Sequence, residues 1–175
     1  MNLEKLTIKA RDALARAQQA VIDQGQQAIE GIHLLKAFLE DPEGVVPAII
    51  KKLGANFEAI RDRTQESLQR LPQVSGGGVG QVYLSNELNT VLNSALKEAN
   101  QLKDEYVSSE HILIAMAETP KSTAAEILRE NGLTKDAIYK VLQEIRGHQR
   151  VTGPNPEDTY QALTRYSREI GRAHV

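Results

Sequence analysis

The sequence predicts an all-α fold built from two tandem four-helix repeats related by pseudo-two-fold symmetry. Three observations favour this fold. Apolar residues recur at helical spacing along most of the chain, and no stretch of four or more residues alternates in the manner of a strand. The sequence also matches itself when it is shifted by 78 residues. A chain of 175 residues is long enough to bury its own core.

The first half of the chain is expected to form amphipathic helices with recognisable ends. Thr7 stands where an N-cap belongs, because its hydroxyl can accept a hydrogen bond from a first-turn N–H group. The apolar positions around it have helical spacing: Leu6, Ala10, Ala13, Leu14, Ala17 and Val21. Gly54 follows Leu53 as expected of a glycine that ends a helix with positive φ. Asn56 is then placed to cap the next helix.

The second half repeats these signals. Ser85 is expected to cap a helix whose apolar positions are Leu88, Val91, Leu92, Ala95, Ala99 and Leu102. Thr123 and Glu126 have the spacing of a capping box. Gly132 is expected to end that helix, and Thr134 to cap the following one. Asn155 before Pro156 predicts one more helix start near the end of the chain.

The internal repeat aligns residues 3–70 with residues 81–148 without a gap. Fourteen of these 68 positions are identical, among them His33/His111 and Gly54/Gly132. Predicted caps align with caps, helix-ending glycines with glycines, and apolar faces with apolar faces. We therefore expect two copies of one helical unit packed against each other.

The chain divides into four parts. Residues 1–74 and 84–147 are the two repeats, and residues 75–83 are a glycine-rich linker. A phosphate-binding loop is the alternative for the linker, but no Lys-Ser/Thr pair follows its last glycine. Residues 148–175 form a connector without a packing partner, which we expect to be less protected from hydrogen exchange than the repeats. Residues 171–175 lack periodicity and are interpreted as a remnant of cloning.

Composition excludes several classes of protein. The net charge of −2 argues against nucleic-acid binding, and the absence of cysteine excludes disulfides and thiolate metal sites. Residues 1–5 lack the pattern of a secretory signal, and the longest apolar run, residues 112–117, is too short to span a membrane. We therefore expect a cytoplasmic protein that binds neither nucleic acid nor membrane.

Few residues suggest chemistry. His33 and His111 each open an apolar stretch; they are interpreted as structural histidines that hydrogen-bond backbone at a helix start, with a ligand or a partner contact as alternatives. Asp104, Glu105 and Glu110 form a local acidic patch, which is either a set of helix-terminus acids or a surface for a partner. No pattern of a catalytic nucleophile or of a metal site is present. We expect no enzyme, no catalytic residue and no metal.

Several motifs resemble a known family. Residues 32–35 read Ile-His-Leu-Leu, residues 110–113 read Glu-His-Ile-Leu, and Leu-Pro-Gln-Val at 71–74 precedes the glycine-rich segment. Together with the two repeats, these resemble the Clp N-terminal domain. The stretches 104–113 and 160–166 are similar to ClpB-type disaggregases rather than to protease-partnered Clp ATPases. The resemblance covers residues 1 to about 170.

This resemblance implies that the chain precedes two AAA+ ATPase modules that form a homohexamer and use ATP. No Gly-x-x-x-x-Gly-Lys-Ser/Thr motif occurs in the chain, so no cofactor is expected in this part. Family positions that handle substrate fall on Thr7, Asp104 and Glu110. Leu92 and His111 are expected to line a neighbouring apolar groove.

The resemblance implies a domain that engages unfolded or aggregated polypeptides and passes them to the ATPase ring of its own chain. A shallow apolar groove rimmed by Asp104, Glu105 and Glu110 would accept apolar segments flanked by basic residues. The alternative is an adaptor-docking or structural helical domain with no affinity for unfolded chains. This part of the protein is expected to be monomeric.

Overall fold

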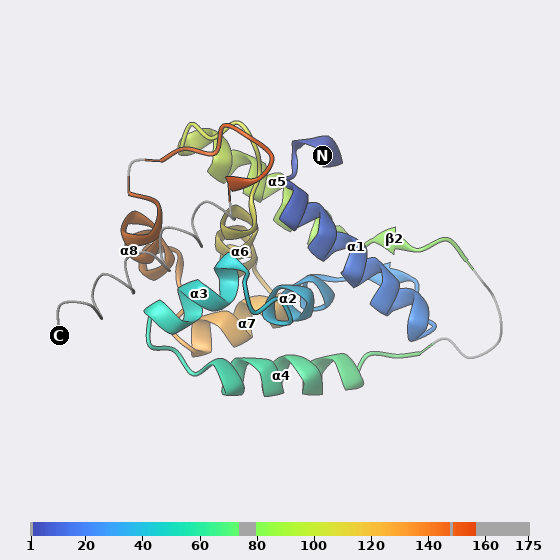
Figure 1. The fold of residues 1–175 in the computed structure, drawn as a ribbon. Coiled ribbons are helices and arrows are strands. Elements are labelled where there is room, and N and C mark those ends of the chain that lie inside the picture. Colours follow the sequence, from blue (N-terminus) through green and yellow to red (C-terminus); the bar gives the residue numbers. More distant parts are fainter. Residues whose placement is uncertain (1, 74–79, 148, 157–175) are drawn as a thin grey trace.

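The computed structural model describes residues 2–73, 80–147 and 149–156. The predicted all-α fold of two four-helix repeats is confirmed (Figure 1). The elements of the first repeat are η1 (Leu3–Lys5), α1 (Ile8–Asp23), β1 (Ala28–Ile29), α2 (Gly31–Leu39), α3 (Val45–Lys52) and α4 (Phe57–Gln69). Those of the second are β2 (Tyr83–Leu84), α5 (Asn86–Gln101), α6 (Ser109–Glu118), α7 (Thr123–Glu130) and α8 (Lys135–Arg146). Each helix of the second repeat begins 78 residues after its counterpart.

Side-chain caps fix most helix starts. Thr7 Oγ1 accepts from Ala10 N at 3.2 Å, and its counterpart Ser85 Oγ accepts from Leu88 N at 3.0 Å. The predicted caps at positions 56 and 134 are also present. The capping box predicted at Thr123 is wrong, because Thr123 is the first helical residue of α7 and the residue before it, Ser122, caps the helix.

Positive φ angles mark helix ends in both repeats. Gly54 and Gly132 follow α3 and α7 with φ of 70° and 83°, as predicted. Gly25 after α1 has φ of 66°, but its counterpart after α5 is Lys103 with φ of 58°. A lysine in the left-handed region carries a steric penalty that glycine avoids. The same turn is therefore built with strain in the second repeat and without it in the first.

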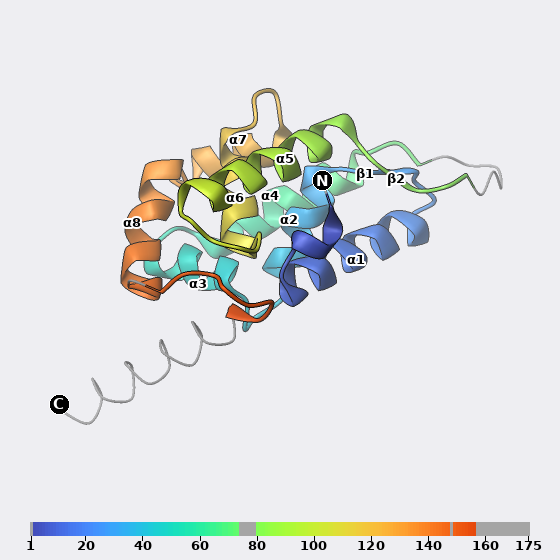
Figure 2. The same ribbon diagram turned by 90° about the horizontal axis from the view of Figure 1, so that it is seen from above.

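Two short parallel pairings join the repeats. Ile29 of β1 pairs with Leu84 of β2, and Leu6 forms a bridge with Val107. Under the 78-residue shift these two pairings exchange into one another, as a two-fold axis between the repeats requires. Figure 2 shows β1 beside β2 at the edge of the helical body. The sequence did not indicate these strands, because two residues are too few to show an alternation.

Helices α2 and α6 lie in the middle of the fold, surrounded by the other helices (Figure 1). Every residue of α2 except Lys36 and every residue of α6 except Glu118 is buried. Both helices are therefore covered on all sides, unlike amphipathic surface helices such as α4. Polar side chains on α2 and α6 must find partners inside the protein.

Residues 149–156, the described part of the connector after α8, pack on the body, whereas residues 148–175 were expected to lack a packing partner. Val151 is fully buried, and its carbonyl oxygen accepts from Glu105 N at 2.7 Å. Further along, Pro154 O accepts from Ile8 N at 2.8 Å. These partners are remote in sequence, so local patterns did not reveal them. The helix predicted from Asn155 onward lies mostly outside the described residues, as do residues 171–175.

Candidate functional site

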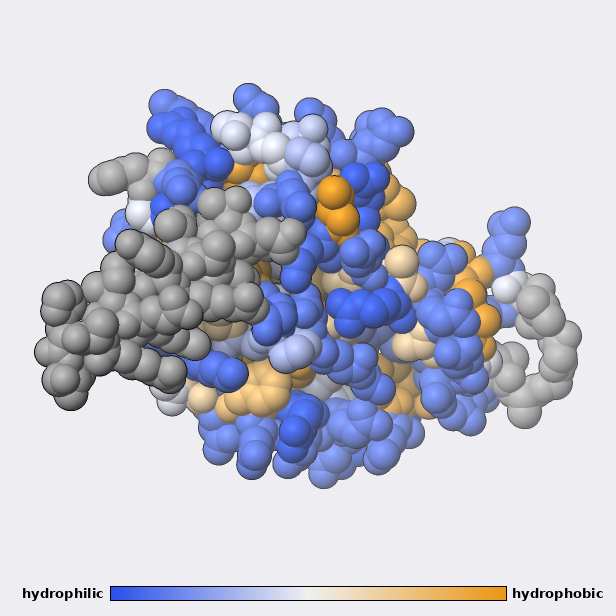
Figure 3. Space-filling model, in the orientation of Figure 1, coloured by the Kyte–Doolittle hydropathy of each residue, from blue (hydrophilic) through white to orange (hydrophobic). Residues whose placement is uncertain are grey.

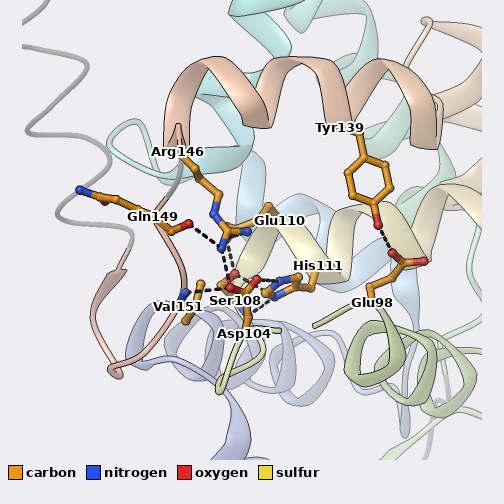
Figure 4. Close-up of polar contacts among 9 residues, drawn as sticks. All are labelled: Glu98, Asp104, Ser108, Glu110, His111, Tyr139, Arg146, Gln149 and Val151. Carbon is orange, nitrogen blue, oxygen red and sulfur yellow. Dashed lines mark hydrogen bonds and ion pairs between the residues drawn. The ribbon is translucent and has the colours of Figure 1, made fainter. Parts of the chain in front are cut away.

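The five residues predicted to bind substrate are all buried. Asp104 is 5% exposed, Leu92 is 2% exposed, and Thr7, Glu110 and His111 are 0% exposed. Asp104, Glu110 and His111 meet in one polar cluster (Figure 4). Thr7 and Leu92 lie outside the cluster, Thr7 as the cap of α1 and Leu92 in the core face of α5.

His111 has the role at a helix start that the structural interpretation predicted. Its Nδ1 accepts from the backbone N of Ser108 at 2.9 Å, closing a capping box at the start of α6. Because Nδ1 is an acceptor there, the ring hydrogen lies on Nε2, which donates to Asp104 Oδ2 at 2.7 Å. The histidine thus ties the start of α6 to the loop that follows α5.

Asp104 is the centre of the cluster. Besides His111, its carboxylate accepts from Arg146 Nη2 at 2.6 Å and from Val151 N at 2.8 Å. Burial raises the pKa of Asp104, but the hydrogen bonds from His111, Arg146 and Val151 N outweigh it and hold the pKa at about 2. One carboxylate therefore joins the α5–α6 loop, α6, the end of α8 and the connector.

Glu110 is less well satisfied than Asp104. Its Oε1 accepts a hydrogen bond from the Ser108 hydroxyl and lies 3.9 Å from Arg146 Nη1. Its Oε2 is buried and has no hydrogen-bond partner among the described residues. Arg146 is therefore the arginine that faces both buried carboxylates, those of Asp104 and Glu110. Its replacement would leave both without a cation.

Ser108, His111 and Asp104 are the residue types of a hydrolase triad. Ser108 Oγ lies 3.0 Å from His111 Nδ1, but Ser108 is fully buried and its hydroxyl donates to Glu110. A substrate carbonyl has no approach to that hydroxyl. The contacts support packing of α6 rather than nucleophilic catalysis.

An open hollow of about 460 Å³ lies beside the cluster, between η1 and the α5–α6 loop. Its lining residues are Asn2, Glu4, Lys5, Asn100, Asp104, Glu105 and Tyr106. Glu105 and Glu4 contribute carboxylates to this opening, whereas the Asp104 side chain is 0% exposed and its carboxylate is occupied by His111, Arg146 and Val151 N. Glu110 does not rim it and Leu92 does not line it, because both side chains point into the protein interior. The expected apolar groove is, at this place, a polar and acidic hollow.

The first repeat has a different group of residues at the equivalent positions. His33 Nδ1 accepts from Glu30 N at 3.0 Å, and its Nε2 donates to Gln26 Oε1 at 2.8 Å. Burial lowers the pKa of His33 to about 4. Gln26 stands where the second repeat has Asp104, so this histidine has a neutral partner.

The residue that sequence reasoning missed is Arg146. Its position aligns with Leu68 under the 78-residue shift. This replacement of an apolar residue by a charged one at equivalent repeat positions could have indicated Arg146. Ser108, which aligns with Glu30, was also missed. Neither residue carries a motif, since their partners are brought together by helix packing.

The described residues contain neither a membrane-spanning helix nor a metal-binding cluster. No described helix is both long and apolar enough to cross a bilayer. No group of three or more His, Asp or Glu side chains in the described part of the chain is placed to hold a metal ion.

The chain matches the sequence model of the Clp repeat (R) N-terminal domain over residues 5–131. Because this match covers most of its length, the protein belongs to the Clp repeat N-terminal domain family. This match confirms the family that the two repeats and the motifs around His33 and His111 predicted.

Within that family, its sequence is similar to ClpB. It is 42% identical over 173 residues to the chaperone protein ClpB of Nitratidesulfovibrio vulgaris, covering 97% of this chain and 20% of the relative. The chain thus spans about one-fifth of the length of the curated relatives it matches.

Solved structures have the same fold. The Hsp104 N-terminal domain of Candida albicans has a TM-score of 0.74 and 24% identity, covering 85% of this chain and 96% of that one. A ClpV N-domain in complex with a VipB peptide has a TM-score of 0.65 and 18% identity, covering 84% and 90% of the two chains. These likenesses agree with the predicted fold class.

Proposed function

We propose that this chain is the polypeptide-engaging N-terminal domain of an ATP-dependent ClpB-type chaperone that resolubilises aggregated proteins. The observation that carries the proposal is the 42% identity to a ClpB over nearly the whole chain. In the complete protein, ATP would be bound and hydrolysed by other domains, assembled as a cytoplasmic homohexamer. The domain itself would capture exposed segments of unfolded chains without a cofactor.

Binding of peptide by this fold has a precedent, since one structural neighbour is described as a ClpV N-domain bound to a VipB peptide. In this chain, the acidic hollow beside η1 offers carboxylates from Glu4 and Glu105. Leu3 and Ile8, at the same end of the molecule, are 44% and 41% exposed. Carboxylates beside apolar side chains suit a peptide segment with apolar residues and flanking basic residues.

The exposed large apolar side chains among the described residues are Leu3 in η1, Ile8 and Ile22 near the two ends of α1, and Tyr83 in β2. Figure 3 shows a mostly hydrophilic face in which hydrophobic areas are small and separated. Such a surface offers short contacts rather than one large interface, so net binding is expected to be weak, with a Kd from about 1 mM to tens of μM. Weak sites suit a domain that releases its chain, and a ring of copies would raise the avidity.

The buried residues Thr7, Leu92, Asp104, Glu110 and His111 would support this surface from beneath. Thr7 N donates to Val107 O at 2.9 Å, which fixes the α5–α6 loop against η1. Asp104 holds the same loop through Arg146 and Val151. We propose that most of the five position the hollow rather than contact the bound chain.

The test is titration of the ¹⁵N-labelled domain with a permanently unfolded polypeptide. Shifts are expected for residues 2–8 and 100–107. Glu105→Lys should weaken binding several-fold because Glu105 is exposed at the hollow, whereas Glu126→Lys, an exposed acid on α7, should leave it unchanged. If no residue shifts at millimolar polypeptide, the domain is a docking or structural module instead.

A further inference from the structure

The described part of the connector, residues 149–156, runs from the end of α8 towards the N-terminal segment of the chain (Figure 1). It bonds to both segments that border the acidic hollow. Val151 O accepts from Glu105 N at 2.7 Å, and Pro154 O accepts from Ile8 N at 2.8 Å. Because Glu105 also lines the hollow, this residue faces the hollow with its side chain and binds the connector with its backbone.

The connector is held mainly by one side chain and by its backbone. Among residues 149–156, Val151 alone is buried, and it packs in the hydrophobic core of the domain. Its N–H donates to Asp104 Oδ1 at 2.8 Å. Thr152 and Pro154 are exposed, and a Cβ added at Gly153 would meet no atom within 4 Å. Docking thus depends on a single apolar side chain and on backbone groups, which other sequences share.

Another extended segment can therefore make the same contacts. Peptide carbonyl oxygens of any sequence can accept from Glu105 N and Ile8 N, as those of the connector do. The buried place of Val151 requires an apolar side chain of similar size. The hollow beside it is lined by Glu4 and Glu105 against Lys5, and this net negative charge favours a segment with a basic residue. The connector has this composition itself, since an arginine directly precedes its valine.

We propose that the connector is an internal occupant of the polypeptide site, and that an extended segment of unfolded polypeptide binds by taking its place. The segment would put an apolar residue where Val151 lies, and its carbonyl oxygens would accept from Glu105 N and Ile8 N. The preferred segment has a basic residue followed by a small apolar one. This inference rests on the proposed function and adds to it the competitor that limits binding.

Competition with a tethered segment has a definite sign. The connector is present at a high effective concentration because it belongs to the same chain. The apparent Kd for free polypeptide is the intrinsic Kd divided by the fraction of molecules whose connector is undocked. A change that weakens docking must therefore tighten polypeptide binding. By linkage, bound polypeptide weakens docking by the same factor, and a force that pulls on the connector would open the site.

A spin label on the connector measures its displacement. The chain has no cysteine, so Thr152→Cys carries a single nitroxide at an exposed position. In the free domain the label should broaden the amide signals of Ile8 and Glu105. Saturation with a short Gly-Ser peptide that has Arg-Val at its centre should restore most of the lost intensity. Peptides with Arg-Asp or Glu-Val at the centre should need at least about fivefold higher concentrations.

Hydrogen exchange distinguishes replacement of the connector from mere loosening. The N–H of Val151 donates to Asp104 only while the connector is docked, so it should exchange faster when the Arg-Val peptide is bound. The N–H of Glu105 should stay protected, because a peptide carbonyl replaces Val151 O. If both groups exchange faster, the peptide does not take the place of the connector and the proposal is wrong.

A variant of the connector tests the sign of the competition. Val151→Ser removes the buried apolar side chain, and should tighten binding of the Arg-Val peptide at least about fivefold. The matched control is Thr152→Ser at the neighbouring exposed position, which should bind as the wild type does. Circular dichroism confirms that both variants are folded. The spin-label measurement does not depend on either variant.

The outcomes separate this inference from the proposed function. If the peptide shifts residues 2–8 and 100–107 but leaves the label broadening unchanged, the connector is no competitor and the proposed function stands. A folded Val151→Ser variant that binds no tighter than the wild type also contradicts competition. If the Arg-Asp peptide displaces the connector as well as the Arg-Val peptide does, the apolar place is wrong. If no unfolded polypeptide binds anywhere on the domain, both proposals fail.

Discussion

His33 and His111 occupy the same place in the two repeats and hold their helix starts in the same way, but they have different neighbours. His33 has the neutral Gln26 and an open hollow, whereas His111 has Asp104, with Arg146 closing the space. The histidine cap at the helix start is thus the same in both repeats. The space beside the histidine ring is open in the first repeat and closed in the second. The residues at the equivalent positions 68 and 146 differ accordingly, since Leu68 lines the hollow beside His33 and Arg146 donates to Asp104.

The largest expected effect comes from Arg146→Leu, which gives the second repeat the residue of the first. It should destabilise the domain by about 3–5 kcal/mol, because Asp104 and Glu110 would remain buried without their cation. Leu68→Ala at the equivalent, half-buried position should cost about 1 kcal/mol. Urea denaturation measures both.

A triple variant sharpens this prediction. Asp104→Gln, Glu110→Ile and Arg146→Leu together install the neutral set of the first repeat, and should recover most of the stability lost by Arg146→Leu alone. A triple variant as unstable as the single variant would contradict the role of unpaired charge. The loss would then come from packing of the arginine side chain.

The two repeats should also lose stability in different pH ranges. The pKa of His33 is lowered from 6.5 to about 4, so its contribution is complete above pH 6.5 and is lost as the pH falls towards 4. The pKa of Asp104 is lowered from 3.8 to about 2, so its contribution is lost only between about pH 4 and 2. The loss should be at most about 3 kcal/mol for His33 and about 2 kcal/mol for Asp104.

Denaturation at a series of pH values checks these ranges. His33→Asn should flatten the profile between pH 6.5 and 4, since asparagine can still accept from Glu30 N. Asp104→Asn should flatten it only below pH 4. A His33→Asn profile as steep as that of the wild type would show that other groups cause the acid sensitivity.

The smallest effect concerns the turns after α1 and α5. Lys103→Gly should stabilise the domain by about 0.5–1 kcal/mol, because glycine adopts positive φ without steric strain and Lys103 has φ of 58°. Gly25→Ala, at the equivalent turn, should destabilise it by about 1 kcal/mol. Thermal denaturation of both variants measures the difference, and a destabilising Lys103→Gly would contradict the strain.

The sequence predicted the fold well because its signals are local and occur twice. Thr7 and Ser85, or Gly54 and Gly132, are cap and turn residues whose meaning depends on their near neighbours. The bridge between Leu6 and Val107 is not local, and a single residue pair leaves no pattern in the sequence.

The candidate site was predicted less completely. The sequence indicated a cluster of acidic residues around His111. It did not indicate that Asp104 and Glu110 are buried beneath Arg146. Burial of a charge depends on a partner from another helix, and α8 lies far along the chain. Alignment of the two repeats would have marked Arg146, because Leu68 stands at the same position.

The bridge between Leu6 and Val107 has a consequence for synthesis of the protein on the ribosome. Leu6 leaves the ribosome before its partner Val107, which lies about 100 residues later, and ribosomes add about 5–20 residues per second. Lys5 O and Thr7 N, which pair with Val107 in the folded domain, therefore lack this partner for about 5–20 s. During that interval the nascent first repeat exposes a free edge to chaperones and proteases, and only arrival of the second repeat closes it.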